Sequence, residues 1–198
     1  MKKKFLLALM TLTLITAYSQ EKGRFRFGLD FGYVPTGGGG GGLISFEPKY
    51  NLANNMNVGL RIGFAGVARD VKSGGSQVTS AKISSVSSFV GTYDYYFHKS
   101  GSSFAPYLGA GLGYYSIANV EAEGSSYTSN VASTGEMGGL IRGGFEWRKL
   151  RVGVEYNIVP DSKLQDINGN VTNTTVANSY VGLSVGFYLG GGKWGGKN

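Results

Sequence analysis

Residues 139–160, GLIRGGFEWRKLRVGVEYNIVP, decide how this chain folds. Read with a period of two, the spacing of a β-strand, the stretch separates into an apolar face and a charged face. If the chain turns back after Arg148, Trp147 lies opposite Leu150 in an antiparallel hairpin. The apolar face of this hairpin is then formed by Ile141, Phe145, Trp147, Leu150, Val152, Val154, Tyr156 and Ile158.

The other face of the hairpin carries charges that match across the turn. Glu146 lies opposite Arg151, and Arg142 lies opposite Glu155. Opposite charges directly across an antiparallel pair attract each other. A soluble sheet buries its apolar face, whereas a membrane barrel turns that face to lipid. The rest of the chain has to decide between these two orientations.

The N-terminus has the pattern of a secretory signal peptide. Three lysines precede an apolar run from Phe5, and small residues follow at Ala17 and Ser19. This order predicts export and cleavage after Ser19, so that residues 1–19 are the signal and residues 20–198 the barrel domain described below. The chain has no Cys, which excludes a lipoprotein anchor and disulfides. Without the signal lysines, the net charge falls from +7 to about +4, and the scattered cations do not indicate nucleic-acid binding.

Outside the hairpin, six further segments alternate apolar and polar residues, and no helical pattern lies between them. The hairpin's first strand is predicted to begin near Gly135. The connections alternate in length, and the long ones are predicted at residues 37–42, 70–80, 121–133 and 161–178. The six further strands are predicted at residues 24–35, 43–51, 57–68, 81–98, 104–117 and 179–189.

Two of the long connections carry strong local signals. Residues 37–42 are six consecutive glycines, which we expect no strand to hold, so we predict a flexible loop. Asn168-Gly169 is a hairpin signal, and a turn there places Tyr156 opposite Val181. The Gly- and Lys-rich tail, residues 190–198, is predicted to be poorly ordered.

Eight strands with alternating short and long connections predict an all-β, eight-stranded antiparallel up-and-down transmembrane β-barrel. An eight-stranded lumen is too narrow for the many large apolar side chains, so we expect these to face lipid, with small and charged residues inside. Aromatic residues at the strand ends support this orientation, because membrane proteins place them at both interfaces. These residues are Phe25, Tyr50, Phe97, Phe104 and Trp147 near the short turns, and Tyr33 and Tyr114 near the loops.

With this pattern, residues 24–189 resemble the small eight-stranded outer-membrane barrel proteins of Gram-negative bacteria, of the OmpA-transmembrane-domain, OmpX and opacity-protein kind. The last strand fits the spacing of that family's assembly signal at Tyr180, Gly182, Val185 and Phe187, although eleven residues follow Phe187. The resemblance implies a monomer in the outer membrane, in contact with its lipid and lipopolysaccharide and inserted by the barrel-assembly machinery. It also implies a possible extracellular ligand at the loops, and it includes porin-like members.

The inward-facing charges are the candidate site. A turn centred on Asn54 would place Glu47 opposite Arg61, and the mid-strand positions of Arg61 and Arg142 make them candidate centres of a lumen network. Such charges either plug the lumen as satisfied ion pairs or line a narrow ion path, and we favour the plug. The predicted network consists of Asp30, Glu47, Arg61, Asp94, Arg142, Glu146, Arg151 and Glu155.

No catalytic, cofactor or metal site is predicted. The only His, His98, is expected in a solvated short turn, away from the end where barrel enzymes of this size act on lipid. Gly109, Gly111 and Gly113 lie within a strand, so they are not a dinucleotide fingerprint. Asp161, Asp166, Asn168 and Asn170 lack the spacing of a Ca²⁺ loop. We therefore expect a structural or surface-interaction role without catalysis. The alternatives are a narrow pore or a transporter of small hydrophobic molecules and, after them, a lipid-modifying enzyme.

Overall fold

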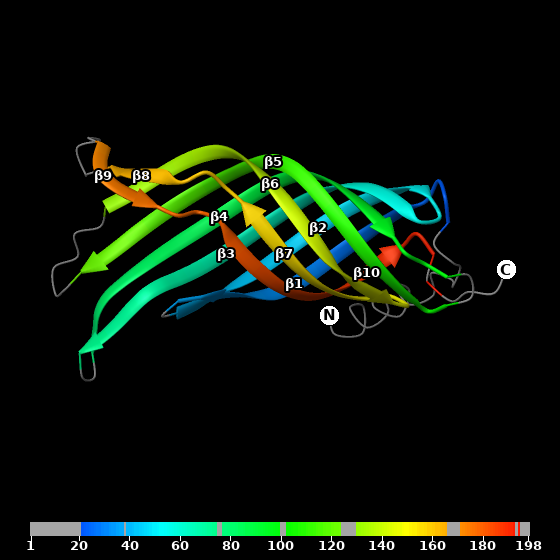
Figure 1. Ribbon diagram of the computed structural model, residues 1–198, viewed down its shortest axis with the longest axis horizontal. Helices are drawn as coiled ribbons and strands as arrows, with labels where there is room; N and C mark the ends of the chain where they lie inside the picture. Colours follow the sequence, from blue (N-terminus) through cyan, green and yellow to red (C-terminus); the bar gives the residue numbers. More distant parts are fainter. Residues whose placement is uncertain are drawn as a thin grey trace, which may run out of the picture.

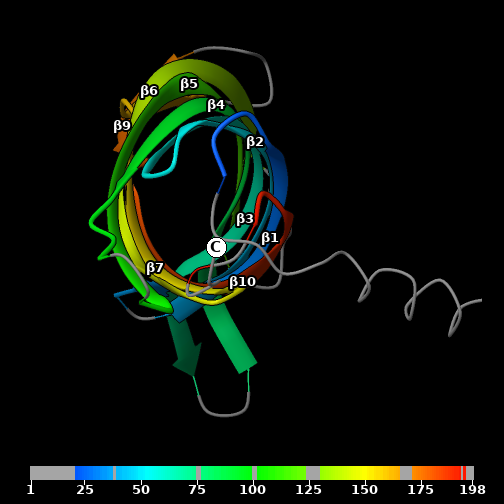
Figure 2. The same ribbon diagram turned by 90° about the vertical axis from the view of Figure 1, so that its right-hand side faces the viewer.

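The computed structural model describes residues 21–37, 39–74, 77–99, 102–123, 130–165, 171–192 and 194. The predicted signal peptide lies outside these residues and stays a prediction. Eight antiparallel strands close into a barrel in the order β1-β10-β7-β6-β5-β4-β3-β2, which confirms the predicted fold (Figures 1 and 2). The barrel strands are β1 (Phe25–Thr36), β2 (Gly39–Ala53), β3 (Met56–Gly74), β4 (Gln77–Tyr96), β5 (Phe104–Glu123), β6 (Asn130–Trp147), β7 (Leu150–Ile158) and β10 (Tyr180–Gly190).

The predicted register of the hairpin at residues 139–160 is confirmed. Between β6 and β7, Trp147 pairs with Leu150, and Glu146 pairs with Arg151. A one-residue slip would have moved every side chain to the opposite face, so the match fixes which residues share a side. The predicted pairing of Tyr156 with Val181, which joins β7 to β10, is also observed.

The outside of the barrel is an apolar band. Large hydrophobic side chains are exposed on every strand of the ring, including all the aromatic residues predicted for the two girdles. On β5 the band covers residues 104–114, and on β6 it covers residues 137–147, which is eleven residues each. A tilted strand needs about 9 to 11 residues to cross a bilayer. The exterior is therefore a lipid-facing surface.

The glycine-run prediction is wrong in its main point. Gly39 to Gly42 belong to β2, where they pair with Thr36 to Tyr33 of β1. A side chain on Gly40 would overlap the Tyr33 ring, and a Cβ on Gly41 would overlap the backbone of Gly66. The run thus allows close contact between neighbouring strands, which a propensity argument does not register.

Two other predicted loops are largely strand. The β3–β4 ladder continues to the pair Gly74 and Gln77, and the β5–β6 ladder continues to Glu121 and Asn130. The four strands β3 to β6 therefore project beyond the apolar band, at the upper and lower left of Figure 1. The predicted polar loop after β7 contains a short hairpin, β8 (Ser162–Gln165) and β9 (Val171–Val176). Within the described residues, no helix is long and apolar enough to cross a membrane.

Candidate functional site

The lumen of the barrel holds the charged residues. All eight side chains of the predicted network are buried, with at most 7% of any residue exposed. Arg26 and Lys49 join them, so the described buried side chains comprise five cations and five anions. A balanced set is required here, because a buried charge without a partner is strongly destabilising. The cations are Arg26, Lys49, Arg61, Arg142 and Arg151, and the anions are Asp30, Glu47, Asp94, Glu146 and Glu155.

Arg142 of β6 lies at the centre of the network. Its Nη1 and Nη2 donate to the two carboxylate oxygens of Glu47 at 3.0 and 2.7 Å, and its Nε donates to Asp94 Oδ1 at 2.8 Å. Lys49 bridges the same two carboxylates, and Thr92 donates to Glu47 Oε1 at 2.6 Å. The guanidinium fork thus joins β6 to β2 and β4 across the lumen, in the bidentate geometry that makes Arg–carboxylate pairs strong.

The predicted pair between Arg142 and Glu155 is wrong, although the two residues are neighbours in the ladder. Glu155 instead accepts from Arg61 Nη2 at 2.6 Å and from Asn157 Nδ2 at 3.0 Å. The ladder pairs on either side, Phe46 with Ile62 and Lys49 with Gly59, keep the register that places Glu47 opposite Arg61. In a closed barrel, long side chains from opposite walls meet in the lumen, and this outweighs adjacency along the sheet.

Glu146 is the common acceptor of a second group of contacts, and this group lies closer to the short turns than the first. Its Oε1 accepts from Arg26 Nη2 at 2.6 Å, from Arg151 Nη2 at 2.9 Å and from the Tyr96 hydroxyl at 2.9 Å. Arg26 also lies against the Tyr188 ring, with its Cζ 3.5 Å from the ring centroid. Burial makes these charge-assisted bonds strong, and it makes the loss of one partner costly.

Arg151 connects the two groups. Its Nη1 lies 3.2 Å from Glu47 Oε2 and 3.7 Å from Asp30 Oδ2, while its Nη2 donates to Glu146. The predicted ion pair across the hairpin turn, Glu146 with Arg151, is therefore present. Arg151 thus links eight of the ten buried charges, whereas Arg61 and Glu155 form an ion pair of their own.

The C-terminal tail closes the short-turn end of this network. Trp194 is 1% exposed, and its Nε1 donates to Glu146 Oε2 at 2.7 Å. Its ring packs 5.1 Å from Tyr96 between centroids. The chain can turn back into the barrel because the three residues 190–192 are glycines with positive φ, a conformation that other residues rarely adopt. The prediction of a poorly ordered tail is wrong at Trp194.

At the loop end, the interior of the barrel changes from charged to apolar. Tyr115 and Tyr180 lie between the two regions, and the Tyr115 hydroxyl donates to Asn157 Oδ1 at 3.0 Å. Beyond them, aliphatic side chains from β1 to β6 fill the interior. Together with the two tyrosines at its border, this apolar layer consists of Val34, Leu43, Ala65, Val67, Val86, Val90, Tyr115, Ile117, Leu140, Val159 and Tyr180.

Several buried lumen residues lie outside the predicted network, although alternation along the strands places some of them on the inward face. Arg26 lies four residues before Asp30 and Lys49 two residues after Glu47, each on the inward-facing side of its strand. Tyr96 follows Asp94 by two residues and also faces inward. The girdle prediction concerns outward aromatic residues at strand ends and leaves Tyr96 without an assignment. Trp194 had no periodic signal, since it lies beyond the last strand.

The structure also shows where the residues of the proposed assembly signal and His98 lie. Tyr180 and Gly182 of the proposed assembly signal face the lumen, whereas Val185 and Phe187 face outward. His98 is half-buried and stacks on Trp194 with 4.4 Å between ring centroids, so the prediction of a solvated residue is wrong.

The alternative ligand motifs add no site. The glycines of the discarded dinucleotide motif lie in β5. Among the described residues, no three His, Cys, Asp or Glu side chains are grouped as metal ligands. Of the four residues considered for a Ca²⁺ loop, Asp161 is exposed. Asp166, Asn168 and Asn170 lie outside the described ranges.

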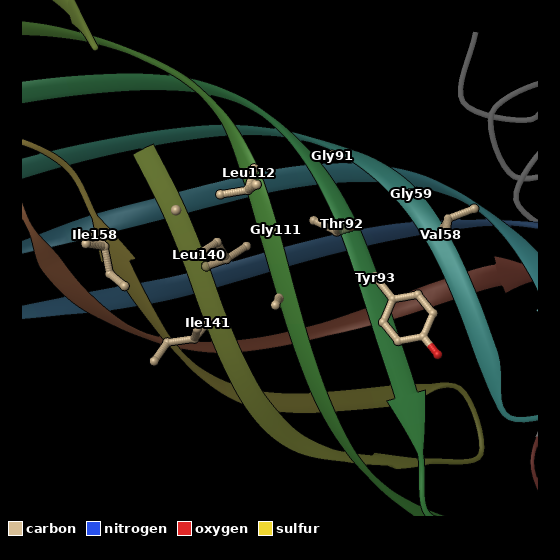
Figure 3. Close-up of a pocket in the computed structure, with 12 residues that line it drawn as sticks. Val58, Gly59, Gly91, Thr92, Tyr93, Gly111, Leu112, Leu140, Ile141 and Ile158 are labelled. Atoms are coloured by element: carbon tan, nitrogen blue, oxygen red, sulfur yellow. The ribbon is translucent and has the colours of Figure 1, made fainter. Parts of the chain in front are cut away.

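A hollow of about 690 Å³ lies on the outer wall of the barrel. Gly91 and Gly139 form part of its floor, and Figure 3 shows Tyr93, Leu112 and Ile141 around it. The ladders beneath this floor are paired without a break, from Ser80 to Tyr96 between β4 and β5 and from Phe104 to Glu121 between β5 and β6. The hollow is therefore a dent in the lipid-facing surface of a continuous wall.

A closed eight-stranded ring, an apolar exterior and a charged interior define a transmembrane β-barrel of the outer-membrane type. No family model and no curated protein sequence matches the chain. The fold is similar to that of OprG, an outer-membrane protein of Pseudomonas aeruginosa, with 13% identity and a TM-score of 0.56 over 88% of this chain and 99% of that one.

Two other solved barrels are similar. Neisserial surface protein A is 18% identical over 85% of this chain and 97% of its own, with a TM-score of 0.49. The N-terminal β-barrel domain of Pseudomonas aeruginosa OprF is 16% identical over 86% of this chain and 100% of its own, with a TM-score of 0.48. At these identities, the likeness concerns the fold.

Proposed function

We propose that this protein is a plugged barrel of the bacterial outer membrane, whose role is structural or is to present a binding surface outside the membrane. The observation that carries the proposal is the filled lumen. Ten buried charges neutralise one another, an apolar layer follows at the loop end, and Trp194 covers the short-turn end. An ion would have to disrupt all three layers to pass.

The projecting strands supply the candidate binding surface. β3 continues past Ala68, its last residue paired with β2, and β6 begins nine residues before Gly139, its first residue paired with β7. A sheet held clear of the bilayer by a rigid barrel suits recognition at the cell surface, because its strands are positioned by the scaffold. An extracellular ligand at this end, contact with lipopolysaccharide, insertion by the barrel-assembly machinery and a monomeric state are parts of the same proposal.

Catalysis is not part of this proposal. His98 faces Trp194 at the short-turn end, and its Nε2 lies 2.8 Å from the carbonyl oxygen of Ser102. This contact uses one of the two ring nitrogens and orients the ring, and it does not by itself identify a catalytic base. Transport of hydrophobic molecules sideways through the wall would require the continuous ladders beneath the outer hollow to open.

Planar-bilayer recording tests the plug. We expect the purified, refolded full chain to give no discrete current steps under conditions in which a water-filled porin conducts. The matched variant is Glu47→Gln, which changes the charge at the centre of the lumen. The proposal would be contradicted if the wild type gave discrete current steps and their cation selectivity differed in Glu47→Gln. Only a current through this lumen would respond to that side chain.

A further inference from the structure

The short-turn end of the barrel carries exposed cations. Lys22, Arg24, Lys99 and Arg148 are all exposed there, and we call them the basic collar. The only carboxylate at this end outside the lumen, within the described residues, is Glu21. It pairs with Arg24 at 3.1 Å, and a surface pair of this kind contributes little. For Lys22, Lys99 and Arg148, the described residues provide no ion pair.

Each strand end of the collar joins a cation to a lipid-facing aromatic residue. Arg24 precedes Phe25, Lys99 follows Phe97 by two residues, and Arg148 follows Trp147. Aromatic side chains of this kind lie at the level of the lipid headgroups. The adjoining cations are therefore held at the same level, where phosphate groups lie.

The backbone of the collar is fixed by hydrogen bonds. Arg148 N donates to Ser103 O at 2.9 Å, and its carbonyl accepts from the Tyr188 hydroxyl at 2.6 Å. Lys22 N donates to Asn54 Oδ1 at 3.0 Å. The cations therefore extend from anchored positions, which lowers the entropy lost when they bind a ligand.

The collar surrounds the barrel instead of forming one patch. Its cations lie at the ends of β1, β4 and β6, and in the ring order these strands are separated by one or two others. A protein partner would touch one side of the rim. A headgroup layer surrounds the whole rim, so it matches this distribution.

We propose that the basic collar binds the phosphate groups of anionic phospholipids in the leaflet that adjoins the short-turn end. The collar supplies the charge, and the adjoining Phe25, Phe97 and Trp147 supply contact with the glycerol and upper acyl region. Attraction of this kind is worth roughly a fivefold gain in lipid association for each cation near the surface.

Quenching of Trp147 fluorescence by brominated lipids tests the proposal. The full chain is reconstituted in phosphatidylcholine vesicles containing brominated phosphatidylglycerol or, in parallel, brominated phosphatidylcholine. The chain has two Trp residues, and Trp194 is buried in the lumen, so the difference between the two lipids reports on Trp147. We expect the anionic lipid to be favoured several-fold at low salt, with the preference reduced at high salt.

Two matched variants separate charge from packing. The triple variant Lys22→Gln, Lys99→Gln, Arg148→Gln should lose the preference, whereas Lys22→Arg, Lys99→Arg, Arg148→Lys should keep it. Heat-dependent gel mobility checks that both variants fold. Equal quenching by the two lipids in the wild type would overturn the proposal, and so would a preference that survives in the Gln variant.

Discussion

Replacing Arg142 by alanine is expected to lower the free energy of unfolding by about 3 to 5 kcal/mol, the usual cost of removing one partner of a buried ion pair. Arg142 is the residue that clamps Glu47 to Asp94. Without it, two carboxylates remain buried close together, with Lys49 as the cation that bridges them. Urea unfolding in lipid vesicles, followed by far-ultraviolet circular dichroism, measures the loss.

Arg148→Ala is the matched control for this prediction. It removes the same side chain from the exposed turn after β6, and in phosphatidylcholine vesicles, which contain no anionic lipid, we expect a change within about 0.5 kcal/mol. A loss below about 1 kcal/mol for Arg142→Ala would mean that water reaches Glu47 and Asp94. That result would contradict a dry plug and favour an aqueous path through the lumen.

Glu146→Gln is expected to have a comparable effect, about 3 kcal/mol, for a different reason. The substitution keeps the shape but removes the charge that Arg26 depends on. The Arg26 Nη2 bond to Glu146 is short, and the Arg26 Nε and Nη1 have no hydrogen-bond partner among the described residues. Arg151 is affected less, because it keeps Glu47 and Asp30. The measurement is the same urea unfolding, with Trp fluorescence as a second signal.

A double-mutant cycle separates the ion pair from other effects of this change. Combining Glu146→Gln with Arg26→Met removes both charges, so the combined loss should be clearly smaller than the sum of the two single losses. Glu21→Gln, which breaks the exposed pair with Arg24, is the control and should cost under about 1 kcal/mol. Additive losses for Glu146 and Arg26 would show that their contact contributes nothing.

Alternation along the strands was enough to predict the barrel and which way its faces point. The β6–β7 register followed from one hairpin, since Trp147, Leu150 and the charges around them pair in only one way without exposing a charge to lipid. The buried state of the network residues could be predicted for the same reason. Each of them lies on the parity opposite to the exposed large apolar residues of its own strand.

The partners inside the lumen could not be predicted in this way. Arg142 bonds to Glu47 and Asp94, which lie on other strands, because a guanidinium reaches across a narrow lumen as easily as along a ladder. The position of Trp194 depends on the turn at residues 190–192 and on a cavity that exists only once the barrel is closed. The glycine strand was missed because its reason is the Tyr33 ring and the neighbouring backbone, which strand propensity ignores.

Site-directed spin labelling on β5 tests most directly whether the barrel is apolar outside and filled inside. The chain has no Cys, so single Cys variants can carry a nitroxide at Tyr107, Leu108, Leu112 or Tyr115 without competing sites. Leu108 and Leu112 are 59% and 75% exposed, whereas Tyr107 and Tyr115 are 3% and 0% exposed. In lipid vesicles we predict high oxygen and low polar-reagent accessibility at the two leucines, and low accessibility to both reagents at the two tyrosines. Strong accessibility of the tyrosine positions to the polar reagent, or shielding of the leucine positions from oxygen, would contradict the account.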